Sequence, residues 1–242
     1  MINKLSIIIP VFNEAQYFEQ SLREIIDLKI INNIKKEIII VDDHSTDGTA
    51  KKIEQLAVND GIEIKKIFHK TNLGKGMAIR SGIQKMTGDY MIVRDADLEY
   101  KAEDINDLVN EVLTNQADVV YGSRFLTSKS RRILFFWHML GNKFLTLLSN
   151  MVNGLNFTDM ETCYKLINKK VLEKINLKEK RFGFEPEITA KIAHIHKKNK
   201  IKIFEIGISY NGRTYKDGKK INWKDGFVAI KCIFLYGLFE EK

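Results

Sequence analysis

Short apolar runs alternate with amphipathic segments along the first half of the chain. Five runs have the length and β-branched content of strands, at residues 5–10, 37–42, 62–68, 90–93 and 118–121. Between them, segments at about 15–29, 47–59, 75–86 and 103–114 carry apolar residues at helical spacing. This alternation predicts a mainly parallel, doubly wound α/β sheet with flanking helices.

Polar side chains follow several of these strands at the point where each strand ends. Glu14 comes after the first strand, Asp43 after the second, and Asp95 and Asp97 after the fourth. The carboxyl ends of parallel strands meet at one edge of a sheet, and open α/β sheets bind ligands there. We therefore expect these residues to share one site.

The stretch VRDADLEY sets Asp95, Asp97 and Glu99 at alternate positions. Carboxylate oxygens suit a hard divalent cation such as Mg²⁺ or Mn²⁺, which bridges nucleotide phosphates and offsets charge on a leaving group. Acidic residues after a strand are also common as turn formers and helix caps. The three carboxylates alone leave both interpretations open.

The loop NLGKGMAIRSG at 72–82 combines flexible and cationic residues before a predicted helix. Gly74 and Gly76 permit a close backbone approach, and Lys75 and Arg80 supply positive charge near the helix start. This favours a phosphate ligand, although the spacing is neither that of a P-loop nor that of a dinucleotide fingerprint.

Charge is distributed unevenly along the 242 residues. Residues 1–121 hold 15 Lys and Arg against 20 Asp and Glu, whereas residues 122–242 hold 24 against 11. The basic second half suggests an anionic partner such as phosphate groups, nucleic acid or an acidic membrane face; a solvated lysine-rich surface is the alternative. Two cysteines without ligand spacing and no recognisable signal peptide favour a cytoplasmic location.

Five stretches together resemble one family: PVFNE (10–14), VDDHSTDGT (41–49), NLGKGMAIRSG (72–82), GDYMIVRDADLEY (88–100) and GSRF (122–125). In order and spacing they are similar to the family 2 glycosyltransferases, most of all to the branch of dolichyl-phosphate mannose synthase and polyprenyl-phosphate glucosyltransferases. The resemblance implies a GT-A fold that binds a UDP- or GDP-linked sugar, a metal-dependent inverting transfer, and no nucleic-acid ligand. It also implies a nucleotide-sugar half at 1–125, an acceptor half with a closing loop at 126–222, and a C-terminal amphipathic helix at 223–242.

The resemblance also assigns roles to residues. The metal and diphosphate segment corresponds to Asp95, Ala96 and Asp97, with Glu99 where the synthases usually carry Gln. Arg124 corresponds to an arginine facing a phosphate, and Arg213 and Lys219 to a loop that closes over the diphosphate. The positions that hold the nucleotide correspond to Pro10, Val11, Phe12, Glu14, Val41, Asp43 and Lys75.

The acceptor is left open between two chemistries. A polyprenyl phosphate, dolichyl or undecaprenyl, is already ionised and needs no general base, whereas a saccharide hydroxyl needs one. Asp159 is the first candidate for such a base and Glu187 the second, although a position near a helix start also explains Glu187. A nucleotide-binding module without catalysis is a further alternative.

Two apolar segments bear on membrane contact, RRILFFWHMLGNKFLTLLSNMV (131–152) and WKDGFVAIKCIFLYGLFEEK (223–242). A bilayer span needs about 20 apolar residues, and polar residues interrupt both segments, so neither is expected to cross. Either segment fits an interfacial helix on the cytoplasmic face of an anionic membrane, or a core helix.

Overall fold

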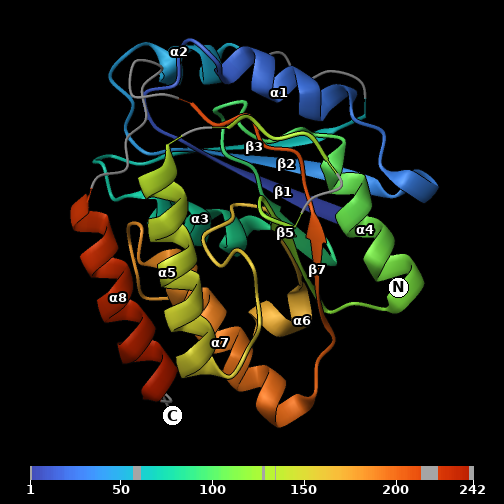
Figure 1. The fold of residues 1–242 in the computed structure, drawn as a ribbon. Coiled ribbons are helices and arrows are strands. Elements are labelled where there is room, and N and C mark those ends of the chain that lie inside the picture. Colours follow the sequence, from blue (N-terminus) through green and yellow to red (C-terminus); the bar gives the residue numbers. More distant parts are fainter. Residues whose placement is uncertain (1, 57–60, 127–128, 134, 214–222, 240–242) are drawn as a thin grey trace.

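The computed structural model describes residues 2–56, 61–126, 129–133, 135–213 and 223–239 (Figure 1). A seven-stranded sheet has the order β3-β2-β1-β4-β6-β5-β7. Its strands are β1 (Lys4–Val11), β2 (Lys35–Asp42), β3 (Glu63–Phe68), β4 (Tyr90–Val93), β5 (Val119–Ser123), β6 (Lys165–Asn168) and β7 (Ile203–Gly207). All neighbours pair in parallel except β6, which is antiparallel to both β4 and β5.

Helices cover both faces of this sheet. In Figure 1, α1 and α2 lie on one side of it, and α3 and α7 lie on the other. The helices are α1 (Phe18–Asp27), η1 (Ile31–Asn33), α2 (Thr49–Glu54), α3 (Lys75–Lys85), α4 (Asp104–Asn115), α5 (Phe136–Asn153), α6 (Lys169–Leu172), α7 (Phe184–Asn199) and α8 (Trp223–Leu238).

The central strands are buried on both faces, which explains their unbroken apolar runs. Ile7, Ile8, Ile38 and Ile39 are fully buried in β1 and β2. Parallel strands covered by helices on both sides require apolar residues at consecutive positions rather than at alternate ones. The five strands and four helices expected in the first half are all present, with ends shifted by a few residues.

The second half completes the same sheet. It supplies β6, which lies between β4 and β5, and β7, which pairs with β5. Neither strand was predicted from the sequence. Residues on both sides of the expected boundary at 125 therefore belong to one sheet.

Helices α5 and α8 lie side by side at one end of the molecule (Figure 1). Each exposes large apolar side chains, among them Phe136, Trp137, Met151, Phe227 and Leu238. In the described part of the chain, no helix combines the length and apolar character that crossing a membrane requires.

Candidate active site

Loops after six parallel strands meet at a cavity of about 1160 Å³. Each of the strands β1, β2, β3, β4, β5 and β7 is followed by residues that line it. The cavity thus brings together most of the residues predicted from the sequence. Those that line it are Pro10, Val11, Phe12, Glu14, Asp43, Lys75, Asp95, Ala96, Asp97, Glu99, Arg124 and Arg213.

Each aspartate of the DAD segment faces a cation. The Lys75 ammonium lies 2.7 Å from Asp95 Oδ2, and Arg213 Nη2 lies 3.4 Å from Asp97 Oδ2. Burial disfavours the charged form of Asp95, but Lys75 holds the pKa of Asp95 below its usual range. Lys75, expected to meet a phosphate, is therefore already paired within the DAD segment.

Asp97 carries the excess negative charge of the site. Burial raises its pKa to about 7, and the nearby Asp95 and Glu99 carboxylates add to this, while Arg213 opposes it. A carboxylate that is disfavoured by its neighbours gains from a divalent cation, and its oxygens are the ligands that Mg²⁺ and Mn²⁺ prefer. The donor atoms at Asp97 therefore fit such an ion.

The carboxylates do not converge on a preformed metal cage. Across the described ranges, no three or more His, Cys, Asp or Glu side chains are grouped to hold a metal ion. Glu99 instead holds the segment after β7: its side chain accepts hydrogen bonds from the Arg213 backbone N–H (2.7 Å) and the Tyr210 hydroxyl (3.2 Å). A metal ligand set would be completed by oxygens from water or from a bound diphosphate in addition to Asp97.

Arg213 links the segment that directly follows β7 to the loop after β1. Its guanidinium donates to both carboxylate oxygens of Glu14, at 3.0 and 3.2 Å, and lies 5.4 Å from the centre of the Tyr17 ring. Its side chain is only 13% exposed. Lys219, predicted to act with Arg213, lies outside the described residues.

The glycines of the 72–82 loop have a role that differs from the expected phosphate contact. A Cβ on Gly74 or Gly76 would lie 2.5 Å from the backbone oxygens of Lys180 or Glu179, and Gly74 has a φ of +94°. These glycines therefore admit the 179–181 segment, whose Lys180 carbonyl also accepts from the Met77 N–H. Packing against this segment explains the glycine spacing without a phosphate.

Asp43 fastens the same loop to the strand ends. Its carboxylate accepts hydrogen bonds from the Leu73 and Gly74 N–H groups at 2.8 and 2.6 Å, and its Oδ1 lies 2.7 Å from His69 Nδ1. Asp43 nevertheless lines the cavity. Val41, which was predicted to contact the nucleotide, is fully buried in β2 and does not line the cavity, because its side chain packs in the core.

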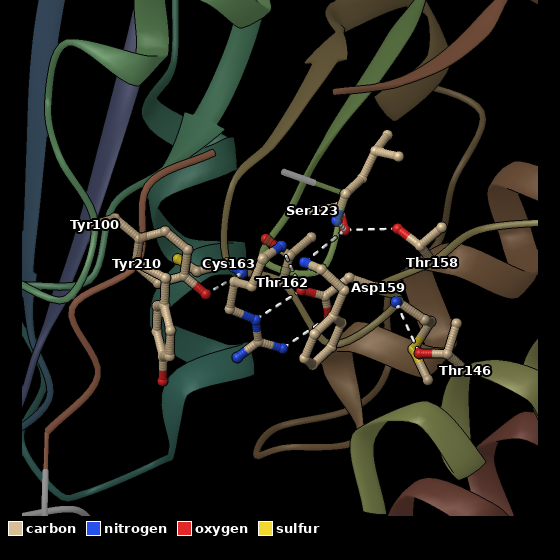
Figure 2. A network of polar contacts seen from close by, with 12 residues as sticks. Tyr100, Ser123, Thr146, Thr158, Asp159, Thr162, Cys163 and Tyr210 are labelled. Carbon is tan, nitrogen blue, oxygen red and sulfur yellow. Dashed lines mark hydrogen bonds and ion pairs between the residues drawn. The ribbon is translucent and has the colours of Figure 1, made fainter. Parts of the chain in front are cut away.

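Arg124 and Asp159 form a buried bidentate ion pair. Arg124 donates from Nε and Nη2 to the two oxygens of Asp159, each at 2.7 Å, and its backbone N–H donates to Oδ2 at 3.0 Å. Figure 2 shows Asp159 in a polar network that includes Thr146, Ser123 and Thr158. Asp159 is fully buried, so its oxygens serve Arg124 rather than a substrate hydroxyl.

Glu187 also differs from its predicted role. It is fully buried near the start of α7, where it accepts from the backbone N–H groups of Lys178 and Glu179 and pairs with Lys191 at 2.7 Å. Glu187 does not line the cavity. Glu187 thus holds residues 178–179 in place, and the structure does not support a general-base role.

The cavity wall includes titratable residues that the sequence analysis did not single out as site residues. Glu161 and Glu185 line it, and Glu185 is ion-paired with Lys165. Beneath the site, Arg94 is fully buried and donates to Glu24 and Tyr164. Of the segment TDMETCYK (158–165), the sequence analysis proposed only Asp159, because nothing local reveals which residues of the segment face a cavity formed by distant strands.

The opposite end of the cavity is apolar. Phe135 before α5, Trp137 and Phe144 of α5, and Phe227 of α8 all line it. One cavity thus joins a charged strand-end region to the aromatic residues of two partly exposed helices.

A family model describes most of this chain. Residues 6–176 match the model of glycosyl transferase family 2. The chain belongs to glycosyl transferase family 2. The resemblance found in the sequence is thereby confirmed.

Curated relatives of this glycosyltransferase carry names that share one kind of acceptor. It is 22% identical over 212 residues to dodecaprenyl-phosphate galacturonate synthase of Rhizobium johnstonii, covering 88% of this chain and 60% of that protein. It is 26% identical to UDP-N-acetylglucosamine--dolichyl-phosphate N-acetylglucosaminyltransferase of Methanococcus voltae, covering 91% of each. The chain thus spans about three fifths of the first relative and nearly all of the second.

Solved structures confirm the fold. Glucosyl-3-phosphoglycerate synthase from Mycobacterium tuberculosis, crystallised with Mn²⁺, UDP and phosphoglyceric acid, superposes with a TM-score of 0.70 at 15% identity. The match covers 99% of this glycosyltransferase and 80% of the synthase chain. The expected GT-A architecture is therefore correct.

Proposed function

We propose that this glycosyltransferase moves a sugar from a nucleotide-diphosphate sugar to a polyprenyl phosphate. The observation that carries the proposal is the two-ended cavity, with Asp95 and Asp97 at one end and Trp137 and Phe227 at the other. A polyprenyl phosphate has the same two-part chemistry, an anionic head on a long apolar chain. The acceptors in the names of the curated relatives support this choice.

In this proposal the donor is a UDP- or GDP-sugar that lies across the strand ends, with its nucleoside near Phe12 and Asp43. Asp97 would hold Mg²⁺ or Mn²⁺ together with the donor diphosphate, and the bound ion would neutralise charge on the leaving group. The Mn²⁺ and UDP that were crystallised with the similar synthase structure support a donor of this kind.

In the transfer itself, an oxygen of the acceptor phosphate attacks the anomeric carbon. The bond from that carbon to the diphosphate oxygen breaks, and its electron pair leaves with the nucleoside diphosphate, so the configuration inverts. The attacking phosphate is ionised and needs no general base, which agrees with the use of Asp159 to hold Arg124. Arg124 faces the cavity and would bind the acceptor phosphate, while Arg213 and Lys75 meet the leaving diphosphate.

A membrane surface would supply this acceptor. Helices α5 and α8 expose aromatic and aliphatic side chains, and exposed Arg131, Arg132 and Lys143 lie before or within α5. Apolar side chains beside basic ones are typical of helices that lie in the interface of an anionic membrane. We therefore infer peripheral binding to the cytoplasmic face of the membrane.

A transfer assay tests the proposal. UDP-glucose, UDP-N-acetylglucosamine and GDP-mannose would each be incubated with Mn²⁺ or Mg²⁺ and with undecaprenyl phosphate in detergent. The expected product is a lipid-linked sugar that no longer forms in chelator. Transfer to a soluble saccharide or to phosphoglyceric acid instead would favour the hydroxyl-acceptor alternative, and nucleotide binding without transfer or hydrolysis would indicate a silent module.

A further inference from the structure

The floor of the cavity between its two phosphate-facing regions is acidic. Lys75 and Asp95 mark the donor side, and Arg124 marks the acceptor side. In a single displacement the anomeric carbon lies between the leaving and attacking oxygens, so the transferred sugar must occupy the space between these two regions. This step rests on the proposed function.

Glu161 and Glu185 line the cavity beside both regions. Glu185 pairs with Lys165, and its Oε1 lies 3.8 Å from the Lys75 ammonium. Glu161 is carried by the segment between α5 and β6 whose Asp159, Thr162 and Cys163 appear in Figure 2. The electrostatic neighbours of Glu161 are Glu185, Lys165, Arg124 and Asp159, which places Glu161 between the donor side and the acceptor side.

Three cations near this floor already have a carboxylate partner. Lys75 pairs with Asp95, Lys165 with Glu185, and Arg124 with Asp159. Glu161 stands outside these pairs. Its Oε1 is buried and, within the described part of the chain, has no hydrogen-bond partner.

A buried carboxyl oxygen without a partner is unusual in a folded protein and indicates a missing donor. Burial, with Glu185 next in importance, raises the pKa of Glu161 to about 7. Near neutral pH a large share of Glu161 is then the neutral acid, which both donates and accepts hydrogen bonds. A sugar hydroxyl is the complementary ligand for such a group.

We propose that Glu161 binds a hydroxyl group of the transferred sugar and that the acidic floor selects donors whose sugar lacks a carboxylate. A uronic acid would bring its carboxylate against Glu161 and Glu185, where the nearest cations already have carboxylate partners and where Lys75, Arg124 and Arg213 would also face the phosphates of donor and acceptor. The remaining arginines that line the cavity, Arg131, Arg132 and Arg181, are exposed. This selection distinguishes the chain from a relative named for galacturonate.

Calorimetric titration in the presence of Mn²⁺ measures how much the sugar contributes to binding. This contribution, the sugar's share of binding, is the ratio of the Kd of UDP to the Kd of the UDP-sugar. Titrants would be UDP, UDP-glucose, UDP-galactose, UDP-glucuronate and UDP-galacturonate, with GDP, GDP-mannose and GDP-mannuronate in parallel. Sugars are then compared within one series, that of UDP or of GDP, whichever nucleotide binds with the lower Kd. For the wild-type chain we expect each neutral sugar to bind at least about tenfold more tightly than its uronate.

Variants of Glu161 test the residue itself. Glu161→Ala should lower the sugar's share of binding by about five- to tenfold for neutral sugars, with the nucleotide Kd unchanged, and Glu161→Gln should restore most of it. Glu173→Ala, at an exposed glutamate outside the cavity, is the matched control. An unchanged nucleotide Kd shows that a variant is folded.

Two results would overturn the inference while leaving the proposed function intact: uronates bound as tightly as neutral sugars, or Glu161→Ala binding neutral sugars like the wild type. Absence of any UDP or GDP binding would instead refute the proposed function, and the sugar subsite with it.

Discussion

Arg213 occupies the position where a cation is needed, and this leads to an unusual prediction for Arg213→Ala. Its guanidinium lies 3.4 Å from Asp97 and 3.9 Å from Glu99, and it donates its shorter hydrogen bonds to Glu14. A metal ion that binds Asp97 must therefore displace this guanidinium or share the carboxylate with it. Removing the guanidinium should strengthen metal binding in the absence of nucleotide.

The size of the effect follows from the contact that is lost. The Asp97 contact is longer than an ordinary charged hydrogen bond, so it is assigned about 1–2 kcal/mol, at or below the usual range for bonds to charged groups. Relief of that competition corresponds to a decrease of about 5- to 30-fold in the Kd for Mn²⁺. The side chains of Arg213 and Asp97 are 13% and 15% exposed, so solvent screening reduces this only modestly.

Isothermal titration with Mn²⁺, without nucleotide, measures the change. Arg23→Ala, at an exposed position of α1 away from the cavity, is the control and should bind Mn²⁺ like the wild type. The same Arg213→Ala variant should transfer sugar more slowly, because the cation that faces the leaving diphosphate is gone. Weaker or unchanged Mn²⁺ binding by Arg213→Ala would refute competition between the guanidinium and the metal.

Three other perturbations test separate parts of the structure. Asp159→Asn leaves the buried Arg124 without its anion and should cost about 3–5 kcal/mol of unfolding free energy; an unchanged Tm in calorimetry would contradict the pairing. Glu37→Gln tests a buried carboxylate. In the wild type, burial favours the neutral acid, but Lys65 and several hydrogen bonds hold the pKa of Glu37 well below its usual range. Its stabilisation is therefore present above about pH 4.3 and lost as the pH falls toward the lower native pKa, so the variant should lose about 2–4 kcal/mol at pH 7 and much less below pH 4. Urea unfolding at pH 7 and below pH 4 measures the unfolding free energy that Glu37→Gln loses relative to the wild type, and equal losses at the two pH values would contradict the prediction. Trp137→Glu should reduce flotation with anionic vesicles several-fold while UDP binding persists, since the indole is 74% exposed on α5; undiminished flotation would exclude α5 from the membrane surface.

Strands β1, β2 and β4 were predictable because each contains a continuous apolar run that is buried on both faces. The edge strand β3, EIKKIF, is only partly buried, and its β-branched residues gave the signal. β6 was not predictable, since its four residues, KLIN, pair with β4 and β5, which are distant in the sequence. Its place in the sheet depends on long-range pairing that no local pattern encodes.

Acidic residues of the site were predictable for a related reason: parallel strands bring their carboxyl ends to one edge. The partners of these acids were harder to foresee. Gly74 and Gly76, beside Lys75, favoured a phosphate ligand, yet a segment a hundred residues later fills the space beside them. Glu161 was not predicted, because its significance lies in an Oε1 atom that has no hydrogen-bond partner among the described residues, which only the folded chain reveals.

The insertion of β6 has a consequence for how the protein is made. β4 and β5 leave the ribosome early, but the strand that joins them emerges only after residue 168. Until then, both strands have an unpaired edge, and nascent chains at this stage are exposed to strand-edge aggregation. A gene fragment that stops at residue 125 should accordingly yield insoluble protein, whereas one that extends past β7 completes the sheet.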